Sequence, residues 1–232
     1  MQKKTKESPK QQDGLSLKNK HLTIHKELYR QRTCFNARFF LYLCRIFTRT
    51  IVIMTKANKV LFITQEITPY VSESEMANIG RHLPQAIQEK GREIRTFMPK
   101  WGNINERRNQ LHEVIRLSGM NLIIDDTDHP LIIKVASIQS ARMQVYFIDN
   151  DDYFQNRLQT ADENGVEYDD NDSRAIFYAR GVLETVKKLR WCPDVIHCHG
   201  WMTALAPLYI KKAYKDEPSF RDAKVVFSVY EG

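Results

Sequence analysis

From Lys59 onward, apolar runs alternate with segments whose apolar residues recur at helical spacing, and this alternation restricts the fold more than any other feature. The run KVLFIT at 59–64 is continuously apolar, as in a strand buried on both faces. The next segment has apolar residues at spacings of three and four: Met76, Ile79, Leu83 and Ile87. This spacing predicts a helix packed on a sheet, and Gly91 can supply the left-handed residue that ends it.

The later segments repeat the pattern. Strands are predicted at EIRTFMP, HEVIRL, NLIID, PLIIKVAS, MQVYFID, DVIHCH and KVVFSV, and helices over about 173–190 and over TALAPLYIKKAY. The acidic stretch from Asp149 to Asp172 is expected to be a mobile loop. We predict an α/β fold, a Rossmann-like doubly wound parallel sheet with a β-hairpin insertion in the middle. Ligands bind such sheets at the carboxyl ends of the strands, here TQEITPYVSESE, HCHGWMT and SVYEG.

The chain has a net charge of +7, and the basic residues are concentrated at its beginning. Residues 1–53 carry 12 basic and 3 acidic residues, a net charge of +9, whereas the remaining 23 basic and 25 acidic residues give −2. We therefore predict a basic, disordered extension over 1–53 and one domain over 54–232. The domain has no basic excess, so nucleic acid is not expected as a partner.

The extension contains an apolar segment, FNARFFLYLCRIFTRTIVI, which is interrupted by Arg38, Arg45 and Arg49. Its longest uncharged run is far shorter than the ~20 residues that span a bilayer, so no membrane segment is expected. A basic amphipathic anchor is one alternative. The favoured reading is that Met54 is the true start. The four cysteines form no C-x-x-C pair and no secretory signal is visible, so a reducing cytoplasm is expected.

The loop after the first predicted strand carries two glutamates where doubly wound folds often hold a phosphate. Ser72, followed three residues later by Glu75, fits a capping box, which satisfies the first N–H groups of a helix internally. Carboxylates at this position stabilise a helix start and repel a phosphate. We favour this structural reading of the stretch from Ser72 to Glu75 over an anion site.

Five segments together resemble one known family: KVLFITQEITPY, RHLPQAIQEKG, MQVYFID, NDSRAIFYARGVLE and PDVIHCHGWMTALAPLYIK. They are similar to the N-terminal domain of bacterial glycogen synthases and plant starch synthases, over residues 59–232. The resemblance implies half of a two-domain, GT-B type glycosyltransferase. That family transfers glucose from ADP-glucose to an α-1,4-glucan with retention, and the resemblance implies no cofactor.

The first motif of the resembled family, E-x-x-P-x-x-K-T-G-G-L-A-D, is only partly present. Glu66, Pro69 and Ala77 match it. The positions of its lysine, threonine, two glycines and aspartate are held by Ser72, Glu73, Ser74, Glu75 and Asn78. A lysine and a glycine pair are what bring charge and backbone N–H groups to a phosphate, so ADP-glucose is a doubtful ligand.

Two further motifs depart from the family in the same way. In H-x-H-D-W, the aspartate position is Gly200, and Met202 stands where a polar residue follows the tryptophan. Tyr230 holds the position of a histidine at the end of the last strand. The family also requires a second domain. We therefore predict no catalytic residues and no transfer by this chain alone. The alternative function is a non-catalytic module that binds a glucan, such as glycogen or a maltooligosaccharide, or a partner glycosyltransferase domain.

The candidate sugar-binding residues are aromatic or polar side chains close to the strand ends: His199, Trp201, Tyr230 and Tyr70. No metal site is predicted. Alternation along a strand places His197 and His199 on one face and Cys198 on the other, with no second ligand cluster at a suitable spacing. The two Asp-Asn-Asp triplets, at 149–151 and 170–172, are interpreted as loop residues or helix caps.

Overall fold

The computed structural model describes residues 59–230, so the expected extension over 1–53 lies outside the described residues. Eight strands form one sheet in the order β3-β5-β6-β2-β1-β7-β8, with β4 paired to β5. Parallel pairing joins β6 (Met143–Asp149), β2 (Glu93–Pro99), β1 (Lys59–Thr64), β7 (Val195–His199) and β8 (Lys224–Ser228). Antiparallel pairing adds β3 (His112–Glu113), β4 (Met120–Ile124) and β5 (Thr127–Ile138). The predicted doubly wound sheet with a hairpin insertion is confirmed.

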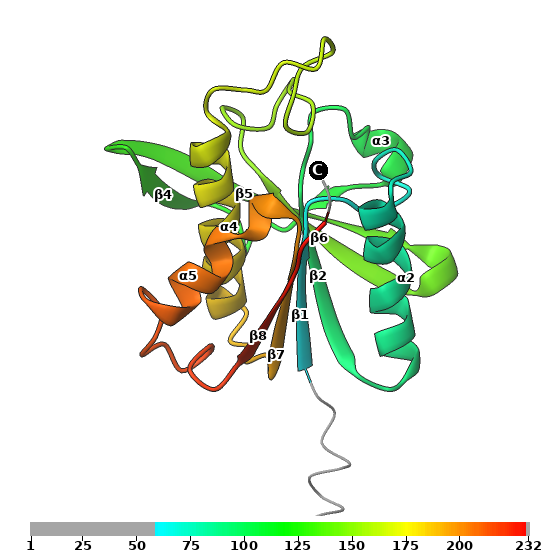
Figure 1. The fold of residues 1–232 in the computed structure, drawn as a ribbon, viewed down its shortest axis with the longest axis vertical. Helices are drawn as coiled ribbons and strands as arrows, with labels where there is room; N and C mark the ends of the chain where they lie inside the picture. Colours follow the sequence, from blue (N-terminus) through cyan, green and yellow to red (C-terminus); the bar gives the residue numbers. More distant parts are fainter. Residues whose placement is uncertain (1–58, 231–232) are drawn as a thin grey trace, which may run out of the picture. The chain divides into compact units, whose positions relative to one another are not determined.

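Helices cover both faces of the parallel part (Figure 1). Helix α2 (Glu75–Glu89) lies on one face, and α4 (Asn171–Lys188) and α5 (Leu205–Lys211) lie together on the other. The short helix α3 (Glu106–Asn109) and two 3-10 turns, η1 (Gln139–Ala141) and η2 (Trp201–Thr203), complete the elements. The helix predicted over 203–214 is thus divided between η2 and the seven-residue α5. No helix among the described residues is long and apolar enough to cross a membrane.

Helix α2 buries a different face from the one its apolar spacing predicts. Its buried residues are Ala77, Gly80 and Pro84, whereas Met76, Ile79, Leu83 and Ile87 are only partly buried. Close approach is the cause, because a Cβ added to Gly80 would lie 2.4 Å from the Glu66 carbonyl oxygen. Small residues must therefore face the β1–α2 loop, and the large apolar residues turn to the flanks.

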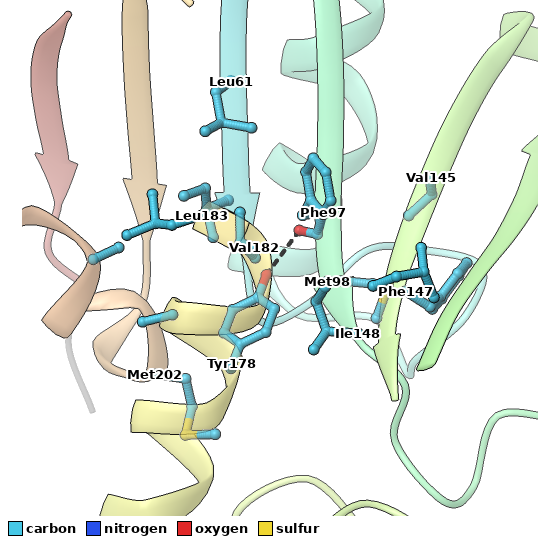
Figure 2. Packing of buried hydrophobic residues seen from close by; sticks show 14 of the residues in the cluster. Leu61, Phe97, Met98, Val145, Phe147, Ile148, Tyr178, Val182, Leu183 and Met202 are labelled. Carbon is cyan, nitrogen blue, oxygen red and sulfur yellow. Dashed lines mark hydrogen bonds between the residues drawn. The ribbon is translucent and has the colours of Figure 1, made fainter. Parts of the chain in front are cut away.

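Tyr178 of α4 links the two central strands near their carboxyl ends. Its hydroxyl lies 2.9 Å from the carbonyl oxygen of Phe97 in β2, the bond that Figure 2 shows, and 2.8 Å from the carbonyl oxygen of Thr64 at the end of β1, so both oxygens share its proton. Burial raises the pKa of this phenol well above its ordinary value, so it stays a donor. The residues that follow Thr64 therefore leave the sheet from a fixed point.

Candidate functional site

The three strand ends selected from the sequence meet around one pocket of about 470 Å³. It lies where β1, β7 and β8 end and α2 begins, the position at which doubly wound sheets bind ligands. The lining residues come from all three segments: Gln65, Glu66, Ser74, Glu75, Met76, Gly200, Trp201, Ala204, Phe227, Ser228, Val229 and Tyr230. None of these is a lysine, an arginine or a histidine.

The start of α2 differs from the predicted capping box. Ser74, and not Ser72, is the N-cap, because its Oγ accepts from the Ala77 N–H at 2.9 Å. The third residue of the helix is then Ala77, whose methyl side chain cannot complete a capping box. The Ser74 hydroxyl instead donates to the carboxylate of Glu66. This contact turns one glutamate toward the pocket, beside the first residue of the helix, Glu75.

Gln65 is a pocket residue that the sequence reasoning missed. Its side-chain Oε1 accepts from the Met202 N–H at 3.2 Å and fills the space beside Gly200. A Cβ at Gly200 would lie 2.5 Å from that Oε1, and Gly200 has φ +81, a value that favours glycine. The signal in the sequence was Gly200 itself, since a glycine after a buried strand often marks a close approach of another group.

His199 lies behind the pocket wall as a neutral, buried group. Its Nδ1 is 2.6 Å from the Tyr230 hydroxyl, and its ring lies 4.4 Å from the ring of Phe62 and 4.0 Å from that of His197, between centroids. Burial, and secondarily the neighbouring His197, lowers the pKa of His199 from 6.5 to about 4. His199 is therefore uncharged at neutral pH, and Tyr230 is the member of the pair that lines the pocket.

This depressed pKa predicts that the domain loses stability in mild acid. Between pH 6.5 and about 4 the unfolded chain binds a proton at His199 that the folded domain does not, so the free energy of unfolding falls as the pH falls. In urea unfolding at a series of pH values, His199→Asn should show a shallower decline than the wild type. His82→Asn, at an exposed position of α2, is the matched control. Parallel profiles for the wild type and His199→Asn would contradict the assignment.

Some of the predicted site residues line the pocket, and others lie outside it. Ser74, Glu75, Gly200, Trp201 and Tyr230 line the pocket, and Trp201 is 47% exposed. Of the remaining altered positions, Ser72 and Glu73 are exposed before α2, and Asn78 is exposed further along it, all three outside the lining.

Two predicted positions are buried elsewhere. Tyr70 is 7% exposed and packs edge-on against Phe147 at 4.9 Å, so it belongs to the core and not to a sugar site. Met202 is fully buried and does not face the cleft. Both errors have one cause, because the direction of a side chain within a loop or a 3-10 turn has no period that a sequence reveals.

Among the described residues, no group of three His, Cys, Asp or Glu side chains is placed so that it could hold a metal ion. Register along β7 places His197 beside His199, with their ring centroids 4.0 Å apart, as the alternation predicted. Cys198 is fully buried, and burial raises the pKa of its thiol to about 12. That thiol is therefore not a nucleophile at neutral pH.

The fold and the pocket together define a doubly wound α/β domain with a pocket at the carboxyl ends of its parallel strands. A family model described as the starch synthase catalytic domain matches residues 59–232. The chain therefore belongs to the starch synthase catalytic domain family, and it is a glycogen/starch synthase-like domain.

Several known proteins are similar to this chain. Glycogen synthase of Pelodictyon phaeoclathratiforme is 41% identical over 179 residues, covering 76% of this chain and 37% of the relative. Glycogen synthase of Chlorobium limicola is 41% identical over 173 residues, covering 74% of this chain and 35% of the relative. Among solved structures, the catalytic domain of starch synthase IV from Arabidopsis thaliana, bound to ADP and acarbose, matches with a TM-score of 0.63 and 20% identity. This match covers 74% of this chain and 34% of the solved chain. The chain thus spans little more than a third of the length of these relatives.

Proposed function

We propose that this domain binds an α-1,4-glucan in the pocket beside Trp201, and that by itself it does not transfer glucose from ADP-glucose. The relatives are named glycogen synthases, and the matched starch synthase holds the oligosaccharide analogue acarbose together with ADP. Those names make a glucan and a nucleotide sugar the two ligand classes to weigh against the residues of this pocket.

The observation that carries the proposal is the charge of the lining. Two carboxylates, Glu66 and Glu75, face the pocket, and no basic side chain lines it. A diphosphate binds where cations or unoccupied N–H groups of a helix start can neutralise it. Here the Ala77 N–H is taken by Ser74, and the first residue of the helix is itself anionic. Bringing a diphosphate into this pocket would set like charges against one another.

A neutral sugar meets no such obstacle. The half-exposed indole of Trp201 offers an apolar face to a pyranose ring, and Tyr230 adds a second aromatic wall. Carboxylate oxygens accept hydrogen bonds from hydroxyl groups at no electrostatic cost, and charge-assisted bonds of this kind are the stronger ones. An apolar wall with a few fixed polar groups is the usual composition of a small-ligand site.

A second candidate function is the acceptor half of a transferase that acts with another glycosyltransferase domain. The match to a family of catalytic domains favours it, as does the fact that the relatives are almost three times as long as the matched region. In that case the cations that hold the diphosphate would come from the other domain. Glucosyl transfer that appears only when such a domain is added would support this candidate.

Calorimetric titration of the full chain with maltoheptaose, and in parallel with ADP-glucose, tests the proposal. We expect heat from maltoheptaose and none from ADP-glucose. Trp201→Ala should weaken maltoheptaose binding roughly tenfold, the effect of losing about 1.4 kcal/mol of ring contact. Leu208→Ala, at a 54% exposed position of α5 outside the lining, is the matched control. Clear binding of ADP-glucose by the chain alone would contradict the interpretation that Glu66 and Glu75 exclude a diphosphate.

A further inference from the structure

We propose that the side-chain amide of Gln65 is the specificity-determining group of this pocket, and that it donates a hydrogen bond to a hydroxyl group of the bound sugar. The inference rests on the proposed function and names a residue that neither the family match nor the altered motif positions indicate. It follows from the hydrogen bonds, the burial and the neighbours of Gln65.

The orientation of the amide is fixed by its partner. A backbone N–H can only donate, so the Gln65 atom 3.2 Å from the Met202 nitrogen is the carbonyl Oε1. The amino group, Nε2, therefore points away from Met202, and it makes no hydrogen bond to any of the described residues. It is also not among the fully buried polar atoms that lack a partner, which in the described part of the chain are Arg95 Nη1, Thr96 Oγ1 and His199 Nε2. Among the described residues the amino group is thus a donor without an acceptor, and it belongs to a residue that lines the pocket.

Gln65 is held rigidly, as a recognition group must be. The whole residue is only 7% exposed, although it lines the pocket. Its backbone carbonyl accepts from the indole N–H of the fully buried Trp101 at 2.8 Å, and the preceding carbonyl, of Thr64, accepts from Tyr178. With the backbone and the amide oxygen both fixed, little conformational entropy remains to be lost when Nε2 binds a ligand.

Gly200 is what makes room for this arrangement. A Cβ there would lie 2.5 Å from Oε1 and 2.8 Å from the Cδ of Gln65, so any other residue would displace the amide. The glycine and the glutamine therefore act as a pair. Position 200, directly after β7, has no polar side chain. The amide of Gln65, in the loop after β1, lies beside it instead.

The polar groups that line the pocket together with Gln65 select the class of ligand. The next residue, Glu66, has one carboxylate oxygen bonded to the Ser74 hydroxyl and the other without a partner among the described residues. A donor and an acceptor in the lining of one pocket match a ring with several hydroxyl groups, one accepting from Gln65 and another donating to Glu66. A phosphate also accepts from an amide, but it would lie against the carboxylates of Glu66 and Glu75. The arrangement selects a neutral, hydroxyl-rich ring.

Gln65→Glu tests the inference, because it keeps an oxygen that accepts from Met202 and replaces the donor by an acceptor. We expect maltoheptaose to bind roughly tenfold more weakly at neutral pH. The affinity of this variant should rise when the pH is lowered to about 5 while the wild type changes little, since a protonated carboxyl group donates again. A purely structural role of Gln65 would not produce this pH dependence. Gln139→Glu, at an exposed position of η1, is the matched control.

Gln65→Met serves as a second variant, because it removes the donor without adding charge, and urea unfolding checks that each variant folds. Weakened binding by both folded variants supports the inference. Wild-type affinity in both overturns it while leaving the proposed function intact. If the wild type itself binds no maltoheptaose, the proposed function and this inference fall together.

Discussion

Replacing Arg174 by alanine is expected to lower the free energy of unfolding by about 4 kcal/mol. This side chain is fully buried in α4, and it donates to the Tyr153 carbonyl at 2.9 Å, the Asn171 side chain at 2.7 Å and the Leu158 carbonyl at 3.1 Å. Its guanidinium also lies over the ring of Trp101 at 5.3 Å. The alanine variant leaves these acceptors buried without a donor, which costs more than the bonds themselves contribute.

The charge of Arg174 persists in spite of its burial. Desolvation lowers the pKa of its guanidinium to about 10, so the group remains protonated at neutral pH. Because the positive charge is satisfied by carbonyl oxygens and aromatic faces, lysine is a poor substitute, and Arg174→Lys should recover only part of the loss.

Urea unfolding of the full chain measures this effect. Arg221→Ala is the matched control, since the Arg221 side chain is 62% exposed and pairs with Asp222 at 3.5 Å. That control should change the free energy of unfolding by less than about 0.5 kcal/mol. An Arg174→Ala variant as stable as Arg221→Ala would show that the contacts of Arg174 do not anchor the loop.

Arg174 also shows what the composition of the acidic stretch between Asp149 and Asp172 does not reveal. Its composition predicts a mobile loop, and the structure shows contacts within that loop: Phe154 is fully buried and Arg157 pairs with both carboxylate oxygens of Asp170. The anchor is a residue of the following helix that donates to backbone carbonyls. Backbone acceptors carry no sequence signature, so composition alone favoured a solvated loop.

The fold itself was predictable because each element repeats a period. A continuous apolar run identified β1, the segment DVIHCH was predicted as the strand that became β7, and helical spacing placed α2 and α4 within two residues of their ends. Periodicity does not show which face lies closest to its neighbour. In α2 that face was set by the contact between Gly80 and the Glu66 carbonyl, a tertiary constraint that made small residues, and not the largest apolar ones, the buried set.

The site was predictable where strand topology decides it and unpredictable where loop geometry does. The carboxyl ends of parallel strands share one edge, so the segments containing Glu75, Trp201 and Tyr230 were expected together, and they line one pocket. Gln65 was missed because it lies outside the altered family positions, ahead of the first of them, Ser72. Its proposed role depends on the space beside Gly200, which no sequence pattern shows.

Gly200→Asp, which would restore the aspartate of the resembled family, is expected to lower the free energy of unfolding by roughly 3 kcal/mol. Two effects contribute. The backbone at φ +81 is strained for any residue with a Cβ, at a cost of about 1–3 kcal/mol. The new side chain would also displace the Gln65 amide from its hydrogen bond with the Met202 N–H, because the Gln65 Oε1 and the Met76 methyl group lie 2.5 Å and 2.9 Å from the added Cβ.

Gly119 offers a comparison at a similar φ. It has φ +80 and nothing within 4 Å of an added Cβ, so Gly119→Asp introduces an aspartate at positive φ without the overlap. Urea unfolding of the two aspartate variants should show Gly200→Asp to be the less stable by more than about 1 kcal/mol. Equal losses would mean that the Gln65 amide does not fill the space beside position 200.

A double-mutant cycle then measures the coupling within the pair. Gln65→Ala removes the amide with which the aspartate would overlap. The loss of stability in the double variant should therefore be smaller than the sum of the two single losses, by roughly 1–2 kcal/mol. Additive losses would show that the two positions changed independently. Coupling would mean that aspartate cannot return at position 200 while glutamine occupies 65. The pocket would then be a rearranged binding site, in which one polar group has replaced another, and not a site that has merely lost its residues.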